Sequence, residues 1–434
     1  MKNITENTHL HFIGCGGAGM APMMMIFHDK GFKVSGSDLI ENEAVIKMKS
    51  MHIRVFKGHD GSNIPDLKKV LVVYSSAVKQ DNPELIESRR RNFECVNRGG
   101  ALALLASSYN RTISVSGSHG KTSVTAVISF ILEKNGFKPG FMIGGKPGPG
   151  MEAFSAGDGG IFVTEADESD GSHVLLKSDL GVVTNVEDDH CWSVGGVEKL
   201  YNNFREFARN SEKLLYVNSP NTDKLFHFHD GGKPFNPTAY EFKNLSPSKL
   251  LEWQGFQLLN AATAVEAAVM IGVEKASAEM VLESFPGVQR RMTLHYDDPV
   301  KKITVMEDYA HHPTELENSI ESLKKRFPGR RLRVVFQPHR YARLARYIDQ
   351  FAAELSKVDE VVITPVFAAW VEKDAIDSRD LVSKIGSNAS YFEDMWDSLA
   401  DKMVSSTQAG DIIAIIGAGD INSLISPLIG KLRQ

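Results

Sequence analysis

A short glycine-rich segment carries the residue types of a phosphate-binding loop: Gly117, Ser118, His119, Gly120, Lys121, Thr122 and Ser123. It follows an apolar, β-branched run at 112–115 and precedes a helical pattern at 124–132. Backbone N–H groups at such a turn converge on phosphate oxygens, and the helix N-terminus adds positive potential. Lys121 would reach the terminal phosphates and the Thr122 hydroxyl a magnesium ion. Because Val115 stands where G-x-x-x-x-G-K-[ST] has its first glycine, a simple helix cap remains an alternative.

A second glycine-rich loop lies near the N-terminus, where Gly14, Gly16 and Gly19 fit G-x-G-x-x-G. It follows an expected strand at 10–13, and Asp38 follows the next expected strand at 32–35. This pattern predicts a pyrophosphate at a helix N-terminus and a ribose or base donor bound by Asp38. Alone it would favour NAD, so a nicotinamide-dependent oxidoreductase is the rival class of enzyme. That alternative leaves the second nucleotide loop at 117–123 unexplained.

Two acidic segments, 165–170 and 187–190, each follow an expected strand. Carboxylates such as Glu165 at strand ends, in the same domain as a phosphate loop, are placed to hold Mg²⁺, which prefers hard oxygen ligands. The alternative is a solvated acidic loop. His190 would more often be a surface or packed histidine than a metal ligand.

Two further segments that follow expected strands, 308–313 and 336–343, are rich in histidine, arginine and tyrosine. His339, Arg340 and Arg343 form a cationic cluster that suits a carboxylate, which arginine can bind through two parallel hydrogen bonds. An exposed basic turn is the alternative. Zinc is a poor alternative because no cysteine accompanies these histidines.

These segments require a scaffold of alternating strands and helices, which predicts parallel sheets and an α/β fold. The pattern divides into three α/β domains in tandem, over 1–107, 108–295 and 296–434. Expected strands lie at 10–13, 32–35, 53–56, 70–75, 112–115, 160–164, 180–184, 303–307, 333–336, 360–364 and 411–416. Expected helices include 101–107, 124–132, 258–270, 314–326, 347–355 and 395–405.

Composition narrows the class of protein further. The 434 residues are 42% hydrophobic and 24% charged, with a net charge of −5 that no basic cluster overrides, which argues against nucleic acid as a partner. Three cysteines lie far apart, so no disulfide framework is expected. No segment approaches the ~20 apolar residues of a membrane span. We therefore expect a cytoplasmic protein with no membrane partner, and its oligomeric state stays open.

Taken together, these strings resemble the Mur ligases of peptidoglycan synthesis, in family order across nearly the whole chain. They are 11–20, 35–38, 117–123, 165–170, 184–190, 308–315, 336–343 and 417–421. The strings Asp-Tyr-Ala-His-His-Pro and Phe-Gln-Pro-His-Arg-Tyr are typical of the branch that adds L-alanine to UDP-N-acetylmuramate. The resemblance implies an ATP-dependent, amide-forming ligase with a Rossmann-like N-terminal domain, a P-loop ATPase-like central domain and a Rossmann-like C-terminal domain.

The resemblance also implies roles for individual residues. The N-terminal domain would bind the UDP-sugar through Gly14, Gly16, Gly17, Ala18, Gly19, Met20, Asp38, Ser75 and Ser76. The central domain would bind ATP through Gly117, Ser118, His119, Gly120, Lys121, Thr122, Ser123, Gln257 and Asn260, with Arg291 and Asp308 on its γ-phosphate and ribose side. Two Mg²⁺ ions would be held by Thr122, Glu165 and His190, and catalysis would rest on Lys121, Glu165 and His190. L-Alanine would be bound by Tyr309, His311, His339, Arg340 and Arg343.

The sequence departs from the family pattern at 144–160, 191–193, 256–257 and 368–370. These departures bear on the sugar acceptor and the amino acid more than on ATP-dependent ligation. A related ligase that adds a peptide or another small amino acid, such as glycine or serine, is therefore an alternative. A non-catalytic UDP-sugar binder is a third class.

Overall fold

The computed structural model describes residues 7–189, 191–369 and 376–434. It is built from three sheets, and the chain separates into two compact units. The first unit comprises residues 1–244 and 260–286, and the second comprises 245–259 and 287–434. No helix of the described segments is long and apolar enough to cross a membrane.

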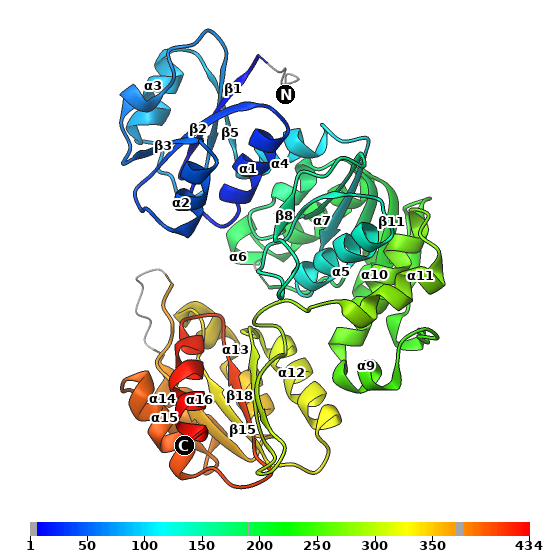
Figure 1. Ribbon diagram of the computed structural model, residues 1–434, viewed down its shortest axis with the longest axis vertical. Helices are drawn as coiled ribbons and strands as arrows, with labels where there is room; N and C mark the ends of the chain where they lie inside the picture. Colours follow the sequence, from blue (N-terminus) through cyan, green and yellow to red (C-terminus); the bar gives the residue numbers. More distant parts are fainter. Residues whose placement is uncertain (1–6, 190, 370–375) are drawn as a thin grey trace. The chain divides into compact units, whose positions relative to one another are not determined.

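The first sheet of unit 1 is parallel, in the order β3-β2-β1-β4-β5 (Figure 1). Helices α1, α2 and α4 share a core on one face, and α3 packs on the other. The Met-rich apolar run of α1 buries Met23, Met24 and Met25 against this sheet. The strands are β1 (His9–Ile13), β2 (Lys33–Asp38), β3 (Arg54–Lys57), β4 (Val70–Tyr74) and β5 (Glu94–Asn97). The helices are α1 (Ala21–Asp29), α2 (Glu43–Ser50), η1 (Gly61–Asn63), α3 (Pro83–Arg90) and α4 (Arg98–Ala106).

The second sheet of unit 1 has seven strands in the order β12-β11-β10-β6-β9-β7-β8, and only β8 runs antiparallel to its neighbour. Its strands are β6 (Arg111–Ser116), β7 (Gly140–Met142), β8 (Phe154–Ser155), β9 (Ile161–Glu165), β10 (Ser178–Val183), β11 (Ser211–Val217) and β12 (Gly232–Phe235). Its helices are α5 (Lys121–Lys134), η2 (Ser172–Leu175), α6 (Cys191–Val194), α7 (Val197–Arg209), α8 (Pro220–Phe226), η3 (Pro237–Ala239), α11 (Lys275–Met280) and η4 (Val281–Ser284). Helix α10 (Phe256–Met270) begins in unit 2 and continues in unit 1.

Unit 2 holds a six-stranded sheet in the order β13-β14-β18-β15-β16-β17, in which β13 is antiparallel to β14. Helices α12, α13 and α14 share a core on one face, and α15 and α16 cover the other. Its strands are β13 (Thr293–Asp298), β14 (Ile303–Asp308), β15 (Leu332–Phe336), β16 (Glu360–Ile363), β17 (Ala389–Tyr391) and β18 (Ile412–Ile416). Its helices are α9 (Pro247–Glu252), α12 (Pro313–Arg326), α13 (Tyr341–Leu355), α14 (Ser378–Ile385), α15 (Trp396–Ser405), η5 (Ile421–Leu424) and α16 (Ile425–Leu432).

The α/β fold and its mostly parallel sheets confirm the expectation from the alternating pattern. Each candidate segment follows the carboxyl end of a strand: 14–19 follows β1, 117–123 follows β6, 309–313 follows β14 and 337–343 follows β15. Ligands of open α/β sheets bind at these carboxyl ends. The fold therefore places each candidate segment at the carboxyl edge of the sheet to which its strand belongs.

Candidate active site

The phosphate-loop segment has the expected strand–loop–helix geometry, running from β6 into α5. Gly117 and Gly120 have φ angles of 136° and 84°, which side-chain-bearing residues rarely adopt. Close contacts also favour glycine at both positions: a Cβ at Gly117 would lie 2.1 Å from Thr184 Oγ1, and one at Gly120 would lie 2.8 Å from Asn260 Oδ1. The structure thus brings Asn260, expected near adenine, beside the phosphate loop.

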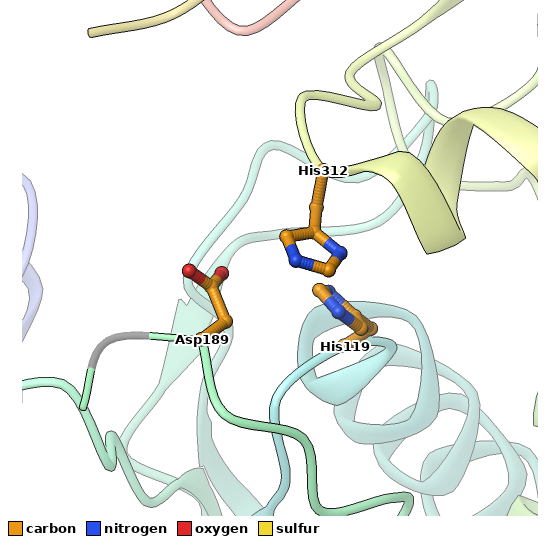
Figure 2. Close-up of side chains that lie close together, drawn as sticks. All are labelled: His119, Asp189 and His312. Atoms are coloured by element: carbon orange, nitrogen blue, oxygen red, sulfur yellow. The ribbon is translucent and has the colours of Figure 1, made fainter. Parts of the chain in front are cut away.

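The segment after β10 holds this loop in place through hydrogen bonds. Asn185 accepts a hydrogen bond from the backbone N–H of His119 (2.9 Å) and donates one to its carbonyl (3.0 Å). Thr184 also donates to that carbonyl, and the backbone N–H of Glu187 donates to Ser118 Oγ (2.9 Å). Figure 2 shows the His119 side chain at the start of α5 and Asp189 on the loop after β10. The third labelled residue, His312, belongs to unit 2.

Lys121 is the first residue of α5, and its ammonium group is held by acidic and carbonyl oxygens. Nζ lies 2.7 Å from Glu168 Oε2 and 2.6 Å from the Gly117 carbonyl. Glu168 is fully buried, and burial raises the pKa of its carboxyl group to about 7 even beside Lys121. Burial opposes the charge on Lys121, but Glu168 together with Asp167 and Glu165 outweighs burial and raises the pKa of the lysine, which stays protonated. The loop thus keeps a buried cation where a phosphate would bind.

Glu165, at the end of β9, faces the same loop. Its Oε1 accepts a hydrogen bond from the Gly144 N–H (2.6 Å), and its Oε2 accepts one from Thr122 Oγ1 (3.2 Å). Burial raises the pKa of this carboxyl group. Thr122 and Glu165 therefore present two hard oxygen atoms side by side, a donor set that suits Mg²⁺. His190, the third expected metal ligand, lies outside the described residues.

The N-terminal glycine loop is tied to the end of β2. The N–H groups of Gly14 and Cys15 donate to the Ser37 carbonyl (2.9 and 3.0 Å), and Gly16 N–H donates to Asp38 Oδ2 (2.7 Å). Among the described residues, the N–H groups of Ala18 and Gly19 have no hydrogen-bond partner. Asp38 thus shapes the loop, and the remaining amides can bind an anion.

The other residues expected at this loop lie close to it. Met20 is buried and donates its N–H to the Gly17 carbonyl, 2.9 Å away. Ser75 follows β4 and donates its N–H to the Ile13 carbonyl (3.1 Å), and Ser76, the next residue, is exposed.

The expected amino-acid residues gather in unit 2. The His339 ring stacks on Phe367 (5.7 Å between centroids), lies 5.5 Å from the His311 ring, and its Nδ1 is 3.2 Å from Arg343 Nη1. Burial lowers the pKa of His311 to about 4 and, with help from neighbouring positive groups, that of His339 to about 3. Both imidazoles are therefore neutral, and the positive charge resides on arginine.

Arg340 precedes α13 with a φ of 66°, and its N–H donates to the Phe367 carbonyl (2.9 Å). Tyr309 contacts His311 edge-on and is flanked by the guanidinium groups of Arg290 and Arg291, 4.8 and 4.9 Å from its ring centre. The cluster thus combines cationic and aromatic side chains within unit 2.

Asp308, a residue of unit 2 expected on the nucleotide side, is engaged within its own unit. Asp308 accepts hydrogen bonds from Met292 N–H (2.8 Å), Ala310 N–H (2.9 Å) and Ser319 Oγ (3.0 Å), and burial raises its pKa to about 6. Gln257 lies on the first turn of α10.

Sequence reasoning did not assign roles to Glu168, Phe367 or Arg290. Glu168 lies within the acidic segment 165–170, but its partner Lys121 is 47 residues away in the sequence, so no local spacing reveals the pair. Phe367 and Arg290 contribute contacts formed only by the fold.

Comparison with known proteins assigns the family. Residues 9–110 match the model described as Mur ligase family, catalytic domain, and residues 290–419 match Mur ligase, glutamate ligase domain. A UDP-N-acetylmuramate–L-alanine ligase of Persephonella marina is 32% identical over 98% of this chain and 97% of its own length. The chain belongs to the Mur ligase family. Its fold is the three-domain Mur ligase architecture.

Solved structures agree. A UDP-N-acetylmuramate–alanine ligase from Thermotoga maritima matches with a TM-score of 0.76 and 26% identity, over 98% of this chain and 99% of that one. A murein peptide ligase from Psychrobacter arcticus matches with a TM-score of 0.64, over 98% of both chains, and at 21% identity this likeness shows the fold alone.

Proposed function

We propose that this Mur ligase joins L-alanine to UDP-N-acetylmuramate at the expense of ATP, in peptidoglycan precursor synthesis in the cytoplasm. The observation that carries the proposal is the phosphate loop, in which Lys121, Thr122 and Glu165 converge at the end of β6 and β9. Full-length similarity to ligases named for these substrates supports it.

We assign the three substrates to three domains, over residues 1–107, 108–295 and 296–434. The first would bind the UDP-sugar at the glycine loop, Asp38, Ser75 and Ser76. The second would bind ATP at residues 117–123 and Asn260, to which the resemblance adds Gln257 and Arg291 of the same domain and Asp308 of the third. The third would bind L-alanine through Tyr309, His311, His339, Arg340 and Arg343.

The residues of the phosphate loop fit Mg²⁺, which would be held by Thr122 and Glu165. A second ion, for which His190 is the assigned ligand, follows from the resemblance. Bound Mg²⁺ would neutralise charge on the transferring phosphoryl group.

The reaction follows from the chemistry of a carboxylate, which is a poor acyl donor. The muramoyl carboxylate oxygen attacks the γ-phosphorus of ATP, the bond to ADP breaks, and an acyl phosphate forms. The uncharged amine of alanine then attacks the acyl carbon, phosphate leaves, and the nitrogen loses a proton. Lys121 reduces the repulsion between the carboxylate and the phosphate, which is the main electrostatic barrier to the first step.

The deciding experiment is a phosphate-release assay with ATP, Mg²⁺, UDP-N-acetylmuramate and L-alanine, each omitted in turn. We expect release only with all four. Tight NADH binding without nucleotide-dependent phosphate release would favour the oxidoreductase. Binding of UDP-N-acetylmuramate without ATP turnover would favour a non-catalytic binder.

A further inference from the structure

Arg98 is a cation beside the N-terminal glycine loop that the assignments above leave unused. It is the first residue of α4, and only about a fifth of its side chain is exposed. A Cβ at Gly19 would lie 3.1 Å from Arg98 Cδ, 3.6 Å from Nη1 and 3.8 Å from Nε. The guanidinium therefore borders the loop whose Ala18 and Gly19 amides are unpaired among the described residues.

The nitrogen atoms of the Arg98 guanidinium face two sides, the acidic loop and Gly19. Nη2 donates to Asp170 Oδ2 at 2.9 Å and lies 3.7 Å from Asp167 Oδ2. Within the described part of the chain, Nε and Nη1 have no hydrogen-bond partner, and they are the nitrogens nearest Gly19. A planar guanidinium can thus hold a carboxylate on one edge and a phosphate on the other.

Asp170 is itself fixed in place. Its Oδ1 accepts a hydrogen bond from Ser172 N–H (2.8 Å) at the start of η2, and Oδ2 accepts the bond from Arg98. Helix α4 packs so closely on η2 that a Cβ at Gly99 would lie 2.2 Å from the Cβ of Ser172. The start of α4 and the acidic loop at 165–170 are therefore held together by these contacts.

The acidic loop reaches the phosphate loop through a second ion pair. Glu168, two residues before Asp170, holds Lys121 at 2.7 Å. Two ion pairs on one short segment thus join the Gly19 side of the first loop to the lysine of the second: Arg98 pairs with Asp170, Glu168 pairs with Lys121, and the chain at 168–170 links the two pairs.

We propose that Arg98 binds the diphosphate of the UDP-sugar and, through Asp170, couples the binding of that ligand to the binding of nucleotide at Lys121. The identity of the two ligands rests on the proposed function. The coupling is positive, because both cations are anchored on the acidic loop: a phosphate that restrains Lys121 also restrains its partner Glu168, and with it the Asp170 end of the loop that positions Arg98. By linkage the effect is reciprocal, so each ligand tightens the other by the same factor.

The test is calorimetric titration of the full chain with UDP-N-acetylmuramate, in the presence and absence of a non-hydrolysable ATP analogue with Mg²⁺. We expect the analogue to tighten wild-type binding about 5- to 10-fold. Arg98→Gln should weaken binding of the UDP-sugar about tenfold and bring the coupling factor close to one. Arg98→Lys should fall between, because one ammonium cannot serve both edges.

Asp170→Asn separates the two roles. It leaves Arg98 to bind the diphosphate, so affinity without nucleotide should stay within about threefold of wild type, while the coupling factor falls. Arg111→Gln, an exposed arginine at the start of β6, is the matched control and should behave as wild type. Thermal unfolding of each variant identifies any loss of fold.

Each outcome decides the proposal. An unchanged coupling factor in folded Arg98→Gln and Asp170→Asn would overturn it, while wild-type turnover would leave the proposed function intact. Equal affinity of wild type and Arg98→Gln for the UDP-sugar would overturn the diphosphate contact. A wild type that binds no UDP-N-acetylmuramate would overturn the proposed function as well, and this result is distinct because it does not depend on the variants.

Discussion

Lys121 illustrates how one side chain serves both stability and the proposed chemistry. Its ammonium group neutralises the buried Glu168 and lies where it could bind a phosphate. We expect Lys121→Ala to lower phosphate release by ~10²–10³, the usual cost of one preorganised charge at a transferring group. The fold should survive, because a Glu168 carboxyl with a pKa near 7 can take up a proton.

The control is Lys134→Ala at the exposed end of the same helix, α5, which should retain full turnover. Both variants are compared by single-turnover ADP formation and by thermal unfolding. Near-normal turnover in a folded Lys121→Ala variant would show that the loop serves only as a helix cap.

His173 gives a pH-dependent prediction for stability. It lies on η2 between Phe204 and Phe207, with ring centroids 5.2 and 5.8 Å away, and neither ring nitrogen has a partner among the described residues. Burial lowers its pKa to about 4. Between pH 6.5 and 4 the unfolded chain therefore binds a proton that the folded chain does not. Stability from this residue should fall with falling pH, by about 3 kcal/mol in all.

Urea unfolding at pH 7.5, 5.5 and 4.5 measures this effect. His173→Phe keeps an aromatic ring but removes the titrating group, so its stability should depend less steeply on acid than that of wild type. Parallel pH profiles for the two proteins would show that His173 does not contribute.

At the scale of elements, the contact between α4 and η2 depends on the absence of a side chain at Gly99. Alanine there would place its Cβ 2.2 Å from that of Ser172 and should destabilise the protein by ~1–3 kcal/mol, as overpacking does. Gly430→Ala in α16 is the control: its Cβ would meet nothing within 4 Å, and helix propensity predicts a gain of ~0.5–1 kcal/mol.

Denaturant unfolding of both variants checks the sign. The double variant Gly99→Ala, Ser172→Gly restores the space and should recover part of the loss. A Gly99→Ala protein as stable as wild type would show that α4 can shift without cost.

Elements with continuous apolar runs were predictable from the sequence, and less regular ones were not. Strands β1, β14 and β18 lie within a residue of their expected bounds because they are buried on both faces. The short, half-buried β5 and the antiparallel β13, whose register shifts between Leu294 and Tyr296, carry no comparable signal. Helix α13 begins six residues before its expected start at Tyr347, where the helical dihedral angles are interrupted.

The candidate site divides in the same way. Loops that follow strands, such as 117–123 and 336–343, are recognisable because glycine, lysine or arginine has a local chemical meaning there. The pairs Lys121–Glu168 and Arg98–Asp170 join residues 47 and 72 positions apart, so only the folded chain shows them.

At the scale of the whole molecule, the chain passes between its two units three times, after residues 244, 259 and 286. The phosphate loop and the glycine loop belong to unit 1, and the cationic cluster around His339 belongs to unit 2. Variants in the cluster should therefore change the use of the amino acid without changing the affinity for nucleotide.

Arg340→Lys is the sharpest case, because lysine keeps the charge and tolerates the same backbone conformation but cannot form two parallel hydrogen bonds with a carboxylate. We expect a sharp rise in the KM for L-alanine, with the KM for ATP unchanged. Arg346→Lys, exposed on the same helix α13, is the matched control and should leave both constants alone. A parallel rise in both KM values for Arg340→Lys would contradict the assignment of Arg340 to the amino acid rather than to ATP.

A panel of amino acids tested on wild type and Arg340→Lys then defines the acceptor. The cluster can fix an α-carboxylate, but an apolar wall distinguishes one methylene by only ~1–3 kcal/mol. We therefore expect alanine to be used best and glycine and serine to be used measurably, with Arg340→Lys impairing all three alike because they share the carboxylate. If wild type rejects all three and accepts a peptide instead, the chain is a peptide-adding member of the family, and the cationic cluster binds a carboxylate of that peptide.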